Sequence, residues 1–219
     1  MSAQEAAPTL EGHGCRISVL PGPGISRARR ALDVVVAVAA LVLLGPLLVL
    51  IAAVIRATSR GPAVFRQIRV GENGIPFTLF KFRTMRVDVR GPELTVPRDC
   101  RVTGVGAILR SSSLDELLQL ANVLRGEMTL VGPRPETPAL AARYPPGCAQ
   151  IFRYRPGITG LAQLRLRDSM TLLPGDGLAS YYFTALVPRR VALDLEFQAE
   201  PTLRRTLTVL IATLNHLFS

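Results

Sequence analysis

Histidine and cysteine are scarce in this chain of 219 residues, and their positions exclude several kinds of site. The two histidines, His13 and His216, lie near opposite ends of the sequence, which argues against a histidine-based triad or a zinc cluster. Three cysteines, Cys15, Cys100 and Cys148, form no CxxC pair and are odd in number, so they fit a reducing compartment better than a disulfide framework. Acid or base chemistry is therefore expected from carboxylates, with arginines as electrophilic partners.

Negative charge is also in short supply. The chain has 26 lysine and arginine residues against 16 aspartate and glutamate residues, a formal net charge of +10, and Lys81 is its single lysine. This balance predicts an anionic partner, such as nucleic acid, anionic lipid or a phosphorylated substrate. With 48% hydrophobic residues, 19% charged residues and mean hydropathy +0.30, the composition excludes a disordered chain or a typical nucleic-acid-binding arm. It predicts that part of the chain sits in lipid.

One long run without charge, residues 34–55, is the candidate membrane segment. As a helix, its 22 residues would be about 33 Å long, which matches a bilayer core of about 30 Å. Gly45-Pro46 lies at its centre, where proline removes a backbone donor and bends a helix. Arginines flank both ends, and the positive-inside rule places such clusters on the cytoplasmic side. The pattern favours a re-entrant helix-break-helix, broken at Gly45 and Pro46, over a kinked full span or a buried hairpin.

The rest of the chain divides into a leader and a globular domain. Residues 1–26 have little apolar periodicity and end in a Pro-Gly-Pro-Gly run, which is typical of a mobile leader. Residues 27–60 form the membrane-inserted segment, and residues 61–219 form one domain of mixed pattern. We therefore expect an α+β fold: a mostly helical domain with a short β-hairpin, preceded by the broken re-entrant helix.

Two segments, 63–70 and 76–83, have the pattern of strands and are joined by a Gly-Glu-Asn-Gly turn signal. The period of two in the second strand places Lys81 and Arg83 on the same face. Two neighbouring cations of this kind suit an anion. The same pattern also fits the solvated polar face of a hairpin.

A helix is predicted to begin at Ser113 and to end at Gly126. Asp115 and Glu116 then lie in its first turn, where the helix dipole lowers the pKa of a carboxylate and keeps it ionised at neutral pH. A structural interpretation is also open, because Ser113 and Glu116 have the spacing of a capping box. The apolar residues that define the helix recur with a period near 3.6: Leu114, Leu117, Leu118, Ala121 and Leu124.

Arginines flank this helix in the sequence, and two of them lie in stiff loops. Arg110 precedes it, Arg134 lies within a Gly-Pro-Arg-Pro run, and Arg155 precedes Pro156-Gly157. Proline restricts the backbone, so Arg134 and Arg155 are held in defined places, as bidentate phosphate recognition requires. An ionised carboxylate beside fixed arginines suggests phosphoryl transfer, with the carboxylate as nucleophile or metal ligand.

Four ordered segments between Lys81 and Gln163 resemble the bacterial sugar transferases, the monotopic polyprenyl-phosphate phosphoglycosyl transferases, in a small form made of the catalytic domain. The segments are KFRTM at 81–85, SLDELLQLANVLRGEM at 113–128, LVGPRPE at 130–136 and RPGITGLAQ at 155–163. The resemblance implies an enzyme of the bacterial inner membrane, with a catalytic domain at 61–219 that faces the cytoplasm. It would transfer a sugar 1-phosphate from a UDP-sugar to undecaprenyl phosphate, release UMP and initiate exopolysaccharide or glycoconjugate synthesis.

Roles for individual residues come from the resemblance alone. Asp115 would be the nucleophile that attacks the β-phosphorus and holds a covalent phosphosugar, and Glu116 would be its acidic partner. Both would hold a Mg2+ cofactor. The expected partners are the UDP-sugar, undecaprenyl phosphate and membrane lipid, with no nucleic acid and with a homodimer allowed. The cations that would neutralise the diphosphate and the acceptor phosphate are Lys81, Arg83, Arg110, Arg134 and Arg155.

The chain departs from the family pattern after Gln163, where Leu164-Arg165 replaces the usual Gly-Arg turn, and at Ala179, where the family commonly has an acid. These positions leave the transferred sugar open. Two other functions also stay open: a membrane-anchored basic binding module, and a transferase-like scaffold that has lost catalysis. An amphipathic stripe at 203–214 would either pack against the domain or lie along the membrane.

Overall fold

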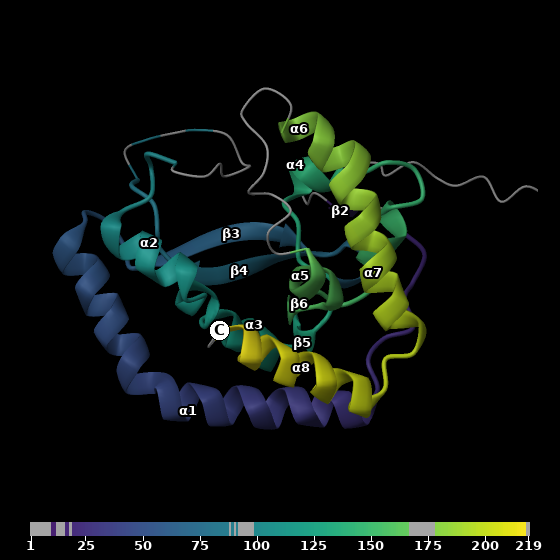
Figure 1. The fold of residues 1–219 in the computed structure, drawn as a ribbon, viewed down its shortest axis with the longest axis horizontal. Helices are drawn as coiled ribbons and strands as arrows, with labels where there is room; N and C mark the ends of the chain where they lie inside the picture. The colour runs from purple at the N-terminus through teal and green to yellow at the C-terminus, as the bar shows by residue number, and fades with distance from the viewer. Residues whose placement is uncertain are drawn as a thin grey trace, which may run out of the picture.

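A long helix, α1 (Arg27–Thr58), forms one side of the structure, and the remaining elements fold against it (Figure 1). The computed structural model describes residues 10–11, 16–17, 19–87, 89, 91, 99–166 and 178–217. Its architecture is α+β and mostly helical with small sheets, as predicted. Apart from α1, the elements are β1 (Leu10–Glu11), β2 (Arg16–Ile17), β3 (Val64–Val70), η1 (Glu72–Gly74), β4 (Pro76–Phe82), α2 (Gly104–Ser111), η2 (Leu114–Glu116), α3 (Gln119–Arg125), β5 (Thr129–Val131), α4 (Pro138–Ala141), η3 (Ala149–Arg153), β6 (Gly157–Thr159), α5 (Leu161–Arg165), α6 (Leu178–Tyr181), η6 (Tyr182–Leu186), α7 (Val187–Ala199) and α8 (Leu203–Leu217).

The predicted break at Gly45 and Pro46 falls inside one continuous helix. α1 begins after Ser26, whose hydroxyl accepts a hydrogen bond from the Arg29 amide (3.3 Å), and it continues for 32 residues with Pro46 in its interior. Figure 1 shows that the helix changes direction partway along, as expected where proline removes a backbone hydrogen bond. The expectation of two separate helices is therefore corrected to one bent helix, which by length and composition is apolar enough to cross a bilayer.

One face of α1 packs along the domain, and the opposite face is uncovered. Arg29, Asp33 and Ala37 are buried toward the N-terminal end of the helix, and Ile51 and Ile55 toward its C-terminal end. Ala37 shares an apolar cluster with α3, whereas Ile55 shares another with α2 and β4. Both ends of the helix are thus attached to the same domain. The large apolar residues that are at least 60% exposed on α1 are Val35, Val42, Leu43, Val49 and Leu50.

Polar contacts reinforce the attachment of the N-terminal half of α1. Asp33 is 1% exposed and accepts hydrogen bonds from the Thr129 hydroxyl (2.8 Å) and the Leu130 amide (3.0 Å). Arg29 donates to the Val131 carbonyl (2.8 Å). Because these partners lie in β5, the short parallel sheet of β5 and β6 is fixed directly to α1.

The predicted hairpin is confirmed. β3 and β4 pair in antiparallel register from Val64 opposite Phe82 to Val70 opposite Pro76. The chain reverses through η1, where Asn73 has a φ of 58°, a left-handed conformation that asparagine tolerates better than most residues. The register determines which side chains of the two strands share a face.

Ser113 does not cap a helix, so the predicted capping box is wrong. α2 ends at Ser111, and Ser113 adopts a left-handed conformation (φ 56°) as the chain changes direction after it. An N-cap serine needs an extended backbone, and the Ser113 side chain makes no capping hydrogen bond. Asp115 and Glu116 consequently lie in a separate 3-10 turn, η2, ahead of α3. The predicted helix end at Gly126 is confirmed by its left-handed φ of 81°.

The last part of the predicted leader contacts the domain. The Gly22 amide donates to the Asn73 side chain (2.7 Å), and Arg153 donates to the Pro21 carbonyl (3.1 Å). Residues 19–26 are therefore held against the hairpin turn and η3. Most of the preceding residues lie outside the described part of the chain.

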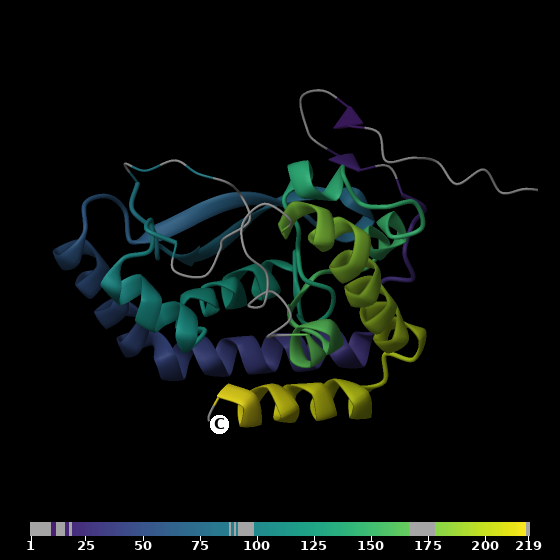
Figure 2. The ribbon, with the colours of Figure 1, turned by 45° about the horizontal axis from the view of Figure 1, so that its top comes forward.

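The predicted amphipathic stripe lies on α8, which packs one side against the domain and leaves other apolar residues exposed. Thr206 and Val209 of α8 are buried, and Figure 2 shows the helix beside α1. Packing against the domain, one of the two predicted arrangements, is confirmed. The exposed large apolar residues of the helix are Leu203, Leu207, Ile211 and Leu214.

Replacing Asp33 with alanine should detach β5 from α1. The Asp33→Ala variant leaves two buried donors without an acceptor, so we expect a loss of roughly 2–4 kcal/mol of stability. The apparent melting temperature in detergent micelles should fall by several degrees. Val35→Ala, which changes an exposed residue of the same helix, is the matched control and should leave that temperature nearly unchanged. Equal melting temperatures for the two variants would contradict the assigned role of Asp33.

Candidate active site

Asp115 lies in η2, between α2 and α3, and its carboxylate is buried without a partner. The residue is 7% exposed and forms no hydrogen bond or ion pair with the residues that the structure describes. Burial raises its pKa to about 6, with help from the charge of Glu116 and against the opposing effect of Lys81, Arg110 and Arg134. The expected lowering of this pKa by a helix dipole is wrong, because Asp115 precedes α3 and is desolvated.

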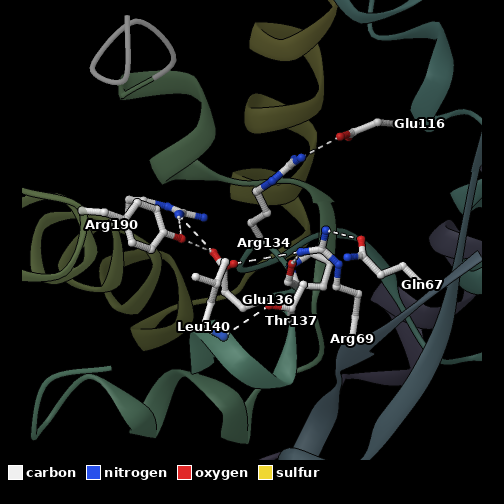
Figure 3. A network of polar contacts seen from close by, with 10 residues as sticks. Gln67, Arg69, Glu116, Arg134, Glu136, Thr137, Leu140 and Arg190 are labelled. Carbon is white, nitrogen blue, oxygen red and sulfur yellow. Dashed lines mark hydrogen bonds and ion pairs between the residues drawn. The ribbon is translucent and has the colours of Figure 1, made fainter. Parts of the chain in front are cut away.

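Glu116 behaves in the opposite way. Its carboxylate accepts a hydrogen bond from Arg134 Nη2 at 2.8 Å (Figure 3). Burial pushes its pKa upward, but Arg134, Lys81 and Arg69 outweigh burial, so the pKa lies below its ordinary value. When the pKa values of two adjacent acids are driven apart, the acids can take different roles. Glu116 stays ionised, while Asp115 titrates near pH 6.

Lys81 is crowded by other cations. Burial, followed by Arg69, Arg134 and Arg110, lowers its pKa to about 8. Its ammonium group lies 5.2 Å from the centre of the Phe65 ring and forms no ion pair within the described part of the chain. Several cations gathered in one place attract an anion strongly, so this group fits a phosphate.

Three of the predicted cations converge on Asp115. Arg110 comes from α2, where its Nε donates to the Thr84 hydroxyl (2.8 Å). Lys81 comes from β4, and Arg134 comes from the loop after β5. All three oppose the rise in the pKa of Asp115. Distant parts of the sequence thus bring one lysine and two arginines to one buried acid.

Arg69 belongs to the same group, and the sequence did not predict it. The register of β3 and β4 puts Gln67, Arg69 and Lys81 on one face of the sheet. Arg69 donates to Gln67 Oε1 (2.7 Å) and to the Pro135 carbonyl (2.9 Å) (Figure 3). The sequence does hold a signal for Arg69. If the two predicted strands pair around the turn, alternate residues of the first strand lie on the same face as Lys81, and Arg69 is one of them.

The other two predicted cations are engaged elsewhere. Arg83 donates to the Ser59 carbonyl (2.9 Å) and hydroxyl (2.7 Å), so it is held at the C-terminal end of α1. Arg155 donates through Nε and Nη2 to Glu72 Oε2 (2.9 and 2.7 Å) in the hairpin turn. Both arginines thus contact polar groups of the fold, although Nε and Nη1 of Arg83 are buried and have no hydrogen-bond partner among the described residues. Their role as phosphate-binding cations stays a prediction.

The two acids fit a magnesium ion that takes most of its ligands from elsewhere. No group of three or more His, Cys, Asp and Glu side chains occurs among the described residues. Mg2+ commonly uses one or two carboxylates together with water and substrate phosphate oxygens. Among the described residues, the carboxylate of Asp115 has no hydrogen-bond or ion-pair partner, and Glu116 uses Oε1 for Arg134. A bound cation would also offset the burial that disfavours ionised Asp115.

A family profile described as bacterial sugar transferase matches residues 25–219. The chain belongs to the bacterial sugar transferases. A UDP-glucose:undecaprenyl-phosphate glucose-1-phosphate transferase of Caulobacter vibrioides is 42% identical over 207 residues, which cover 91% of this chain and 73% of that protein. A transferase of the same name from Escherichia coli is 43% identical over 150 residues, 66% of this chain and 32% of that protein. The UDP-N-acetylgalactosamine-undecaprenyl-phosphate N-acetylgalactosaminephosphotransferase of Aeromonas hydrophila is 38% identical over 152 residues, 67% of this chain and 36% of that protein.

The predicted family is thus confirmed. This bacterial sugar transferase spans about three-quarters of the Caulobacter relative and about a third of the other two. The residues that its fold gathers at η2, namely Lys81, Asp115, Glu116 and Arg134, come from three of the four segments that carry the family resemblance.

The raised pKa of Asp115 predicts a pH-dependent effect on stability. The folded protein holds the Asp115 proton more tightly than the unfolded chain does, so this contribution is present at low pH and is lost as pH rises through about 6. Asp115→Asn should therefore be more stable than the native protein at pH 7.5, by on the order of 1–3 kcal/mol, and equally stable at pH 4. Thermal unfolding in detergent without divalent ions measures this. A gain of equal size at both pH values would show that titration is not its cause.

Proposed function

We propose that this protein transfers a sugar 1-phosphate from a UDP-sugar to undecaprenyl phosphate at a membrane surface. The observation that carries the proposal is the buried, partner-free carboxylate of Asp115 among Lys81, Arg110 and Arg134, with Glu116 beside it. The relatives named above support it, because their names describe transfer to undecaprenyl phosphate with glucose or N-acetylgalactosamine as the sugar.

The chemistry runs in two displacements at one phosphorus. Ionised Asp115 attacks the β-phosphorus of the UDP-sugar, the bond to the bridging oxygen breaks, and UMP leaves with that oxygen and its electron pair. The sugar phosphate is then bound to Asp115 as an acyl phosphate. A phosphate oxygen of undecaprenyl phosphate attacks the same phosphorus, which releases the Asp115 carboxylate and yields undecaprenyl diphosphate sugar. No proton has to be supplied to either leaving group when both leave as anions.

Electrostatic stabilisation is the main task of the surrounding residues. A carboxylate has to approach a diphosphate, and fixed cations lower the cost of bringing these two anions together. Lys81, Arg110 and Arg134 surround the reacting carboxylate from three elements. The ion pair with Arg134 keeps Glu116 ionised, so Glu116 is suited to hold Mg2+ together with Asp115. When bound, the metal would neutralise charge on the diphosphate.

We propose further that α1 enters and leaves the membrane on the cytoplasmic side. Its two halves pack on one domain, through Ala37 at one end and Ile55 at the other, and a straight span could not keep both contacts. The helix bends partway along and has Pro46 in its interior, and its uncovered apolar side chains, such as Val42 and Leu43, suit burial in lipid. This arrangement holds the site at the interface, where a soluble UDP-sugar and a lipid phosphate both have access.

Loss of the Asp115 carboxylate should abolish transfer. With Mg2+ and undecaprenyl phosphate, the native protein should release UMP from at least one donor in a panel that includes UDP-glucose and UDP-N-acetylgalactosamine. Asp115→Asn should lower the rate by about a thousandfold or more and form no acid-stable labelled adduct. Glu196→Gln, which changes an exposed acid of α7, is the control and should act like the native protein. Near-native turnover by folded Asp115→Asn would refute the nucleophile, and no UMP from any donor would favour a binding module or an inactive scaffold.

Cysteine labelling in intact cells tests the position of α1. Leu20→Cys and Thr58→Cys, each placed in a chain whose three native cysteines are replaced by serine, report on the two ends of the helix. Both should be protected from a membrane-impermeant maleimide and should react after the inner membrane is permeabilised. Reaction of Leu20→Cys alone from outside would establish a full span.

A further inference from the structure

A second buried acid, Glu136, lies next to the loop that carries Arg134. Its carboxylate accepts a hydrogen bond from the Tyr182 hydroxyl (2.7 Å) and forms ion pairs with Arg190 Nη1 (3.1 Å) and Arg69 Nη1 (4.0 Å) (Figure 3). These partners come from β3, η6 and α7. Arg69 belongs to the cations of the site, whereas Glu136, Tyr182 and Arg190 have no role in the proposed transfer so far.

The loop is fixed on both sides of Arg134. On its C-terminal side, the Val70 amide donates to the Glu136 carbonyl (2.8 Å), and Arg69 donates to the Pro135 carbonyl (2.9 Å). On its N-terminal side, the Gly157 amide donates to the Pro133 carbonyl (2.8 Å). Two prolines next to Arg134 restrict the backbone further. The Cα of Arg134 is therefore held in place mainly by its neighbours in the sequence.

The contacts of the Arg134 side chain are too weak to fix its position. The side chain is 43% exposed, and its ion pair within the described residues is the one with Glu116. A half-exposed ion pair contributes little free energy, because water and lost side-chain freedom offset the attraction. The geometry between Arg134 and Glu116 thus depends on the backbone of the loop, which Glu136 anchors.

A turn of π-helix brings two of the partners of Glu136 together. Tyr182 and Arg190 are eight residues apart, and in an uninterrupted α-helix they would point about 80° apart around the axis. The π turn in η6 takes up one extra residue and reduces this angle to about 20°. Arg190 Nη1 accordingly donates to the Tyr182 hydroxyl oxygen (2.9 Å), and both groups reach Glu136.

Stability alone gives a weak reason for this arrangement. The side chains of Arg69, Arg190 and Glu136 are all at least four-fifths covered, so three charges have been taken out of water. Buried ion pairs of this kind are often no more stable than apolar side chains of similar volume, whereas they do fix one geometry. These ion pairs fix the geometry of the loop that carries Arg134, which points to a role for them in the reaction.

We infer that Glu136 is a positioning residue, which acts on the reaction through Arg134. The inference rests on the proposed function and adds a residue to it. Glu136 draws β3, the loop and the start of α7 together through Arg69, Tyr182 and Arg190. The loop then presents Arg134 to Glu116 and to the phosphate bound beside Asp115.

A double-mutant cycle in the full-length protein in detergent tests this, with UMP release from the best donor of the panel as readout. Glu136→Gln should lower kcat about 10- to 100-fold, with a smaller change in the KM of the donor, because Arg134 is displaced while the substrate-binding surface remains. In an Arg134→Ala background, Glu136→Gln should change kcat by no more than about twofold. Glu196→Gln is the matched control, since this exposed acid also lies between two arginines, Arg165 and Arg205.

Two outcomes would overturn the inference. One is unchanged kcat in Glu136→Gln, and the other is an equal loss of activity with and without Arg134, which a merely structural role would give. If Glu136→Gln fails to fold, Tyr182→Phe removes one hydroxyl from the same carboxylate and should show a smaller loss that also disappears without Arg134.

A second measurement separates this inference from the proposed function. Hydrogen exchange of the loop amides of Gly132, Arg134 and Glu136 should be at least about tenfold faster in Glu136→Gln than in Glu196→Gln, whether or not the protein releases UMP. Equal exchange in the two variants would overturn the inference. A native protein without UMP release, but with the expected exchange, would refute the transfer reaction alone.

Discussion

The close placement of two acids, buried Asp115 and half-buried Glu116, is the constraint on which the rest of the structure depends. Neighbouring carboxylates that are partly removed from water repel each other, which favours their neutral forms unless cations lie near. The fold meets this constraint unevenly: Glu116 receives Arg134 directly, whereas Asp115 receives only the more distant effect of three cations. One acid is thereby satisfied, and the other is kept available for a ligand.

Pairing Arg134 with Glu116 while leaving Asp115 without a direct partner requires precise placement of the backbone at both sites. Much of the domain contributes to that placement. The parallel pair β5 and β6 carries the Arg134 loop, and the backbones of Gly132 and Gly157 approach so closely that a side chain on Gly157 would clash. The hairpin supplies Lys81 on the face that it shares with Arg69. Asp33 ties β5 to α1, so the long helix is part of the framework that positions the site.

Local patterns in the sequence predicted the hairpin, the helix end at Gly126 and the motif around Asp115, because turn residues and periodicity act over a few positions. The rest depended on contacts between distant segments. Ser113 has a left-handed backbone between α2 and η2, which no capping pattern in the sequence reports. Arg83 and Arg155 resembled phosphate ligands in sequence, but their partners Ser59 and Glu72 are known only once the fold brings them near.

The attachment of α1 at both ends has a consequence for how the chain folds. The cluster around Ala37 includes Leu120 and Val123 of α3, and the cluster around Ile55 includes Phe82 and Leu109. Without the helix, these apolar surfaces would be uncovered, so the domain has no complete core of its own. Docking of α1 and completion of the tertiary fold are therefore one coupled event. A chain in which α1 does not dock would leave both surfaces open to aggregation and proteolysis.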